Sequence, residues 1–266
     1  MSKIDHAMHQ LQSLEMLANE DRWMNRLHPS VKLFITIFYI VFVVSFSKYQ
    51  LAGLLAMAIY PAALFIIGEL SFKDALHRLR IVLPVVCMVG IINPFLDRNV
   101  AITLFGIGIS GGVLSMLSLM VKGVLAVLAS YLLIATTSIE KICYALRQAH
   151  VPKILVSEVL LIYRYLTVLL SEARRVVTAY SLRAPGQKGI AVNAWGSLAG
   201  QMLLRSMDRA ERVYQSMCLR GFRGEFYPAH QGKMRGTDWL WFLFWTLLLV
   251  ALRYGNVTEL IGKLFV

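Results

Sequence analysis

Residues Gly111 to Thr136 read GGVLSMLSLMVKGVLAVLASYLLIAT, and Lys122 is the only charged residue in this run. At about 1.5 Å per residue, a helix of this length crosses the roughly 30 Å hydrocarbon core of a bilayer with some tilt. A lysine near the middle of a span is costly, so Lys122 either contacts a partner subunit or pairs inside the helix bundle. Structural pairing is the more common explanation.

The rest of the chain has the same character. Its 266 residues are 58% hydrophobic and 16% charged, whereas a soluble protein is nearer ~25% charged. The composition therefore predicts an all-α polytopic membrane protein. Uncharged runs extend over Leu33–Ser47, Tyr49–Gly68, Ile81–Leu96, Gly123–Ile139 and Trp239–Leu252.

Five membrane spans follow from these runs, and the basic connectors place the N-terminus inside the cell and the C-terminus outside. The first two spans form a tight hairpin or one bent element, because only Lys48 and Gln50 interrupt them. We expect Glu69–Arg80 to be a basic connector and Asp97–Ile109 to be a turn-rich external loop. The predicted spans are Lys32–Ser47, Leu51–Gly68, Ile81–Phe95, Gly111–Thr136 and Asp238–Tyr254.

The chain is accordingly divided into four segments. Residues 1–31 form an N-terminal cytosolic or interfacial segment without an apolar leader, and residues 32–138 contain the first four spans. Residues 139–236 form cytoplasmic helices, and residues 237–266 form the last span and a tail. The three cysteines are far apart, so they are expected to be reduced and to form neither a disulfide nor a zinc site.

The net charge of +12 is not spread evenly, because fifteen of the 27 Lys and Arg residues lie between Ile139 and Gly236, against six acids. Basic excess beside membrane spans marks the cytosolic side and suits anionic lipid head groups. We therefore expect contact with the lipid bilayer and no nucleic-acid partner.

This basic region is predicted to be a bundle of amphipathic helices, too polar to span the membrane and too apolar to be free in water. The clearest helix is Val156–Arg183, and a second covers Leu204–Met217, with Asp208 and Arg212 as a favourable i,i+4 pair. A short helix over Ile139–Ala149 precedes them. The Gly196-x-x-x-Gly200 spacing would allow two of these helices to approach closely.

The two longer helices end in nearly the same tripeptide. Leu182-Arg183-Ala184, here called the first tip, is matched by Leu219-Arg220-Gly221, the second tip. A cation at a helix C-terminus gains about 0.3–1 kcal/mol from the helix dipole, so each arginine taken alone is interpreted as a helix cap. Two matching copies favour a docking role, in which the two helix ends enter two similar pockets of a partner. Arginine suits this role because its planar guanidinium presents several donors to carboxylates.

With these tips the chain resembles the transmembrane T component of energy-coupling factor (ECF) transporters, which carry two Ala-Arg-Gly-like signatures on coupling helices. Leu27-His-Pro-Ser-Val-Lys-Leu33, Ala135-Thr-Thr-Ser138 and Leu161-Ile-Tyr-Arg-Tyr165 with Glu172 also resemble family motifs, in the same order. Ala184-Pro185 departs from the usual glycine. Met217-Cys-Leu-Arg-Gly-Phe-Arg-Gly224 and the long N-terminal segment are most similar to the cobalt type, CbiQ.

The resemblance implies a non-catalytic scaffold in a bacterial cytoplasmic membrane that couples two ATP-binding-cassette ATPases to a small substrate-binding membrane subunit. Arg183 and Arg220, with Leu182, Ala184, Leu219 and Gly221, are then the ATPase-coupling residues. ATP would bind the partners, since the chain has no GxxxxGK[ST] loop, and this chain would hold no cofactor or metal.

Three alternatives stay open at this point. The chain is a nickel or vitamin T component, a permease of a different ATP-binding-cassette importer, or a membrane-embedded enzyme. An ordinary permease is disfavoured because Glu172-Ala173 is followed by Arg174 and lacks the expected loop glycine. An enzyme is disfavoured because the sequence has no HExxH motif and its spans are nearly bare of polar residues.

Overall fold

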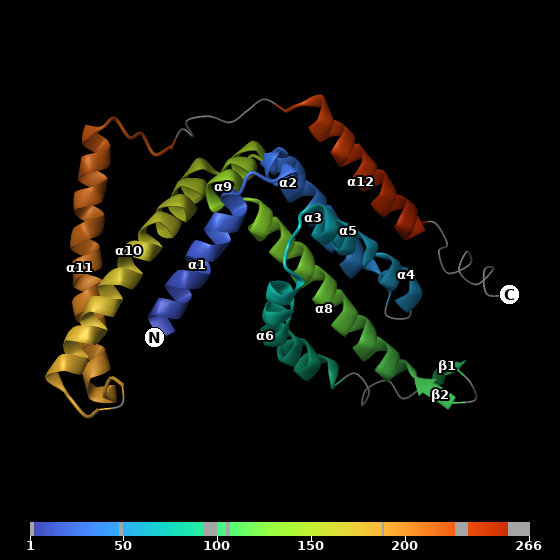
Figure 1. Ribbon diagram of the computed structural model, residues 1–266, viewed down its shortest axis with the longest axis horizontal. Coiled ribbons are helices and arrows are strands. Elements are labelled where there is room, and N and C mark those ends of the chain that lie inside the picture. The colour runs from blue at the N-terminus through green and yellow to red at the C-terminus, as the bar shows by residue number, and fades with distance from the viewer. Residues whose placement is uncertain are drawn as a thin grey trace. The chain divides into compact units, whose positions relative to one another are not determined.

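The computed structural model describes residues 3–47, 50–92, 100–104, 107–187, 189–226 and 234–254. These residues are almost entirely helical (Figure 1), which confirms the predicted fold class of an all-α membrane protein. The chain divides into two compact units, one of Met1–Met16 with Ile139–Gln231 and one of Leu17–Ser138 with Gly232–Val266. The assignment of segments to sides of the membrane stays a prediction.

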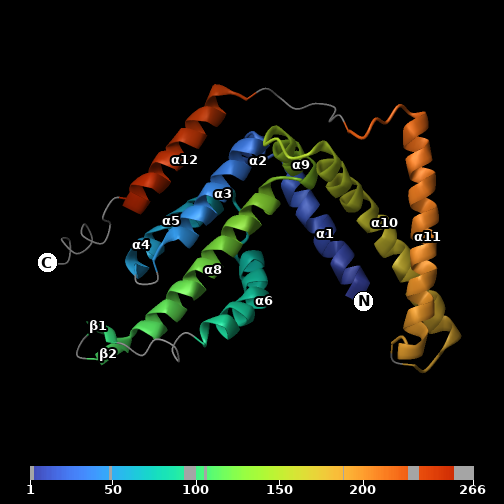
Figure 2. The ribbon, with the colours of Figure 1, turned by 180° about the vertical axis from the view of Figure 1, so that it is seen from behind.

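The unit that contains the predicted spans is built around α8, Gly111–Thr136, which packs against α3, α5 and α6, while α12 packs against α3 (Figures 1 and 2). Glycine allows α8 and α6 to approach closely, since a Cβ atom on Gly123 of α8 would lie 3.1 Å from the side chain of Val86 in α6. The other helices of this unit are α2 Trp23–Arg26, α3 Pro29–Ser45, α4 Leu51–Ala56, α5 Ile59–Ile67, α6 Phe72–Gly90 and α12 Gly236–Tyr254.

The first two predicted spans form a hairpin and not one bent element. The hydroxyl of Tyr39 in α3 donates to the carbonyl oxygen of Met57 at 3.1 Å, and the ring of Tyr39 stacks on Tyr60 of α5 at 4.4 Å between centroids. Tyr39 and Met57 are fully buried and Tyr60 is nearly so. These contacts fold the second span back along the first, and the second span breaks into α4 and α5 near Met57.

Two connecting segments differ from the prediction. Most of Glu69–Arg80 is not a connector but the first half of α6, which starts where the Ser71 hydroxyl accepts a hydrogen bond from the Asp74 amide at 3.4 Å. The expected external loop contains an antiparallel pair of strands, β1 Val100–Leu104 and β2 Ile107–Ser110, because β-branched residues favour extended backbone. The third span beyond residue 92 lies outside the described residues.

Lys122 has structural partners. Its ammonium group donates to the carbonyl oxygens of Val44 and Phe46 at 3.1 and 2.5 Å. These carbonyls belong to the last turn and C-cap of α3, whose orphan acceptors a cation satisfies well. The explanation that Lys122 pairs inside the helix bundle therefore accounts for its place in α8.

The second unit holds most of α1, Lys3–Asn19, together with α9 Ile139–Gln148, α10 Lys153–Arg183 and α11 Val192–Leu219. Pro152 directly precedes α10 at the N-cap position, where its φ is −50° and no side-chain capping hydrogen bond is formed. Three helices of the described chain are long and apolar enough to cross a membrane, namely α8, α10 and α12. The expectation that the Val156–Arg183 helix is too polar to span was therefore wrong on composition, because its charges gather toward its C-terminal end.

Candidate functional site

Both tips stand at the exposed C-terminal ends of long helices. The side chain of Leu182 beside Arg183 is 77% exposed, and that of Leu219 beside Arg220 is 90% exposed. Arg183 is the last residue of α10, and Arg220 is the C-cap of α11. Each arginine is thus flanked on its N-terminal side by an exposed leucine.

The second tip ends α11 in a Schellman motif. The amide of Phe222 donates to the Met217 carbonyl at 2.9 Å, and the amide of Gly221 donates to the Cys218 carbonyl at 3.0 Å. Gly221 has φ of +83°, a left-handed conformation that glycine adopts without a Cβ penalty. The chain therefore turns sharply after Arg220, which leaves the guanidinium at the end of the helix.

The first tip ends differently, although its sequence is similar. Ala184 is the C-cap with φ of −124°, and the amide of Gln187 donates to the Ala184 carbonyl at 3.3 Å across Pro185 and Gly186. Proline followed by a glycine with positive φ, here +98°, is the pattern of a type II turn. The substitution of Ala184-Pro185 for glycine thus changes how the chain leaves the helix and keeps Arg183 in its last turn.

The structure does not bring the two arginines together. The hydroxyl of Ser157 in α10 donates to the carbonyl of Gly224 after α11, and Glu172 of α10 meets Arg209 of α11. Rising numbers on one helix are paired with falling numbers on the other, so α10 and α11 run antiparallel (Figure 1). Arg183 lies at the turn of this helical hairpin, and Arg220 lies toward its open end.

Arg220 lies in a groove that is lined by several arginines and by Glu225. Besides Arg220, the groove is lined by Arg164, Arg209, Arg212 and Arg223. The expected ion pair between Asp208 and Arg212 is not formed in the part of the chain that the structure describes. Arg212 instead lines the groove, because tertiary packing and not i,i+4 spacing decides where its exposed side chain lies. The surroundings of Arg220 therefore favour an acidic partner.

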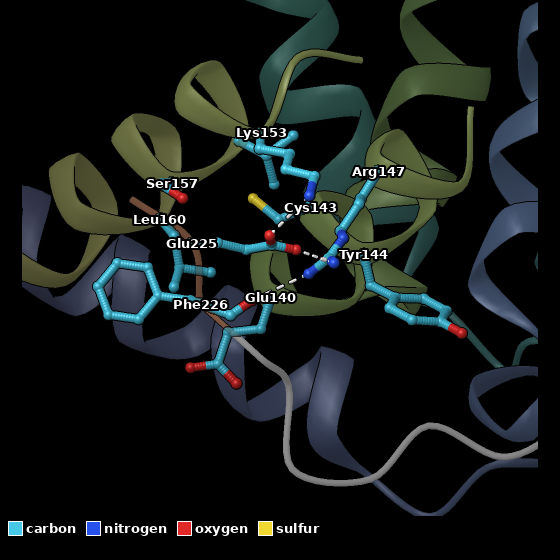
Figure 3. Close-up of a pocket in the computed structure, with 10 residues that line it drawn as sticks. Glu140, Cys143, Tyr144, Arg147, Lys153, Ser157, Leu160, Glu225 and Phe226 are labelled. Carbon is cyan, nitrogen blue, oxygen red and sulfur yellow. Dashed lines mark hydrogen bonds and ion pairs between the residues drawn. The ribbon is translucent and has the colours of Figure 1, made fainter. Parts of the chain in front are cut away.

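A buried carboxylate holds the segment that follows the second tip (Figure 3). Glu225, whose side chain is 10% exposed, pairs with Arg147 of α9 and with Lys153 of α10, the latter at 2.9 Å. Arg147 also donates to the carbonyl of Phe226 at 3.2 Å. Sequence analysis missed this cluster, although Glu225 is the only acid between Glu211 and Asp238 in a basic stretch.

The pocket around Glu225 also contains Cys143. Burial, with a smaller contribution from Glu140, raises the pKa of the Cys143 thiol. A protonated thiol is a poor nucleophile and a poor metal ligand. No cluster of three or more histidine, cysteine, aspartate or glutamate side chains suited to a metal occurs among the described residues.

The Gly196-x-x-x-Gly200 spacing serves no close approach of helices within the part of the chain that the structure describes. A Cβ atom on either glycine would meet no other atom within 4 Å among the described residues. The prediction that these glycines let the coupling helices cross was therefore wrong. The crossing of α10 and α11 involves residues nearer Arg209, because the register of the hairpin places that part of α11 opposite α10.

Comparison with known proteins adds two findings. A family model described as CbiQ, cobalt transport protein, matches residues 20–234. A protein of Methanocaldococcus jannaschii described as uncharacterized is 25% identical to this chain over 120 residues, which are 44% of this chain and 40% of that protein. The matched part thus spans about two fifths of the curated relative's length.

Proposed function

We propose that this chain, which belongs to the CbiQ family of cobalt transport proteins, is the transmembrane scaffold of an ECF-type cobalt importer. It would lie in the bacterial cytoplasmic membrane and catalyse no reaction itself. ATP would be bound and hydrolysed by two ATP-binding-cassette subunits, and cobalt would be bound by a separate small membrane subunit. Membership of a transport family and the multi-pass helical fold support this assignment.

The observation that carries the proposal is the pair of exposed tips on antiparallel helices. Arg183 and Arg220 each end a helix of about thirty residues, beside leucines that are 77% and 90% exposed. Since the helices run in opposite directions, the tips are separated and each would reach its own ATPase subunit. Leu182 and Ala184 would contact one ATPase, and Leu219 and Gly221 the other.

Coupling would follow from the rigidity of these helices. When ATP binding closes the ATPase dimer, the two docking grooves move together and carry the tips with them. A long helix transmits such a displacement along its length, because the hydrogen bonds of its interior backbone link each turn to the next. The apolar faces of α10 and α11 would pass the movement to the substrate-binding subunit, whose reorientation releases the ion.

The test is copurification from the native host after gentle extraction, with identification of the bound chains by mass spectrometry. We expect an ATP-binding-cassette ATPase and a small polytopic membrane protein. The identity of the small protein separates cobalt from nickel or a vitamin as the substrate. Recovery of the chain alone, under conditions that keep other transporters intact, would contradict the scaffold function and leave the two arginines as helix caps.

A further inference from the structure

Glu172 of α10 lies between two arginines that are one helical turn apart on α11. Its Oε2 atom is 2.7 Å from Nη2 of Arg209, and its Oε1 atom is 3.8 Å from Nη1 of Arg205. The Glu172 side chain is only 15% exposed, whereas those of Arg205 and Arg209 are 53% and 38% exposed. The carboxylate on α10 thus accepts a hydrogen bond from Arg209 while Arg205 lies within ion-pair distance of its other oxygen.

The position of this contact relative to the tips is symmetric. Arg183 follows Glu172 by eleven residues on α10, and Arg220 follows Arg209 by eleven residues on α11. At 1.5 Å per residue each tip lies about 16 Å along its helix from the ion pair. Because the helices are antiparallel, the two tips lie on opposite sides of the contact and at equal distances from it.

Apart from the Glu172 ion pairs, the facing surfaces of α10 and α11 are mostly apolar and do little to fix the register of one helix on the other. An open groove with apolar walls separates the N-terminal half of α10 from the C-terminal half of α11, with Leu161, Leu169 and Val213 among its lining residues. No other ion pair joins α10 to α11 within the ranges that the structure describes. Apolar surfaces slide without breaking directional bonds. Among the described residues, the Glu172 contact therefore sets the position of one helix on the other together with the Ser157–Gly224 hydrogen bond and the Lys153–Glu225 pair at the open end of the hairpin.

We propose that Glu172 is the pivot of the coupling helices and that its carboxylate passes from Arg209 to Arg205 when the tips move. A shielded carboxylate left without a partner is costly, so intermediate positions are disfavoured and the hairpin has two preferred registers. One-turn shifts of packed elements are a known form of bistable transition, at about 5.4 Å per turn. The inference rests on the proposed function, since the ATPases would supply the displacement.

The experiment compares purified transporters that carry Arg205→Gln, Arg209→Gln or Glu172→Gln with the wild type. Three quantities are measured for each, namely the amount of copurifying ATPase, the rate of ATP hydrolysis, and the uptake of radioactive Co²⁺ into cells. We expect assembly and ATP hydrolysis near wild-type levels and uptake lowered by about ten-fold. The reason is that the α10–α11 hairpin then has one preferred register in place of two. A merely structural role would lower all three quantities together.

Two further variants sharpen the test. Arg175→Gln removes an exposed arginine of α10, three residues after Glu172, that forms no ion pair among the described residues, and it should behave as wild type. Arg205→Lys keeps a cation and should retain most of the uptake. Wild-type uptake by Arg205→Gln would overturn the proposal, as would a parallel loss of hydrolysis and uptake. A wild-type complex without ATPase or Co²⁺ uptake would instead contradict the proposed function.

Discussion

The ammonium group of Lys32 donates a hydrogen bond of 2.8 Å to the main-chain carbonyl of Thr136, 104 residues later in the chain. Lys32 is 6% exposed and Thr136 is 2% exposed. The contact ties the first turn of α3 to the last residue of α8 and occupies a carbonyl that has no acceptor role within the helix. Two helices distant in sequence are thus joined where α8 ends.

Replacing Lys32 by Met should destabilise the protein while preserving most of the side-chain volume. A hydrogen bond from a charged donor contributes about 1.5–3 kcal/mol, and its loss leaves the Thr136 carbonyl buried. The melting temperature in detergent should fall accordingly. Lys141→Met, which removes a partly exposed lysine of α9, is the matched control, and equal melting temperatures for the two variants would contradict a role for Lys32.

The protein should lose stability on acidification through His28, the N-cap of α3. Burial lowers the pKa of His28, and the carboxylate of Asp238 opposes this only in part. The folded state therefore binds fewer protons than the unfolded state, so stability falls as the pH drops below the ordinary histidine pKa of about 6.5. Protonation also removes the Nδ1 acceptor of the Ser30 amide, which lies at 3.3 Å.

Thermal unfolding measured across this pH range tests the prediction. His28→Asn keeps an N-cap acceptor and removes the titrating group, so its melting temperature should depend less on pH than that of the wild type. Identical pH profiles for the two proteins would show that another group is responsible.

Arg183→Ala and Arg220→Ala should each weaken ATPase copurification and abolish transport, with the membrane fold intact. Removing one member of a desolvated charged pair costs about 2–5 kcal/mol. Arg→Lys should rescue only in part, since the planar fork is lost. Circular dichroism of the purified chain checks the fold, and a double variant that still copurifies and transports normally would refute the docking role.

Gly221→Ala should disturb the second tip through the backbone alone. An added Cβ would meet nothing within 4 Å, but φ is +83°, where an L-residue costs about 1–2 kcal/mol. We expect weaker ATPase copurification as the turn after Arg220 relaxes. Gly196→Ala is the matched control, because it lies in open space within α11 and should leave copurification unchanged. The same result for both variants would contradict the prediction.

Glu225→Gln should free the segment that follows the second tip. The substitution removes the charge that Arg147 and Lys153 share, so the chain around Gly224 should detach from α9 and α10 more often. Limited trypsin digestion should then cut faster after Arg220 and Arg223. Glu158→Gln, at an exposed position of α10, should digest as the wild type does, and unchanged cleavage in Glu225→Gln would show that the cluster does not hold the segment.

Local signals predicted the C-terminal ends of α10 and α11 well, whereas α11 begins at Val192, twelve residues before the predicted Leu204. Pro152 directly precedes α10, Pro185 with Gly186 follows its end, and Gly221 follows the end of α11, because these residues restrict or release the backbone independently of the rest of the fold. The same reasoning failed for Glu69–Arg80, where charge suggested a connector. Packing against α8 instead extends α6 through part of that basic stretch.

The sequence by itself determined that the chain is a helical membrane protein with two arginine-tipped helices, since apolar run length and helix-terminating residues act locally along the chain. Only the tertiary structure decided which groups the charged side chains contact. Lys122 with Val44, Glu172 with Arg209 and Glu225 with Arg147 depend on the register of packed helices. A helix presents many equivalent faces to its neighbours, and only the combined packing of the whole unit selects one.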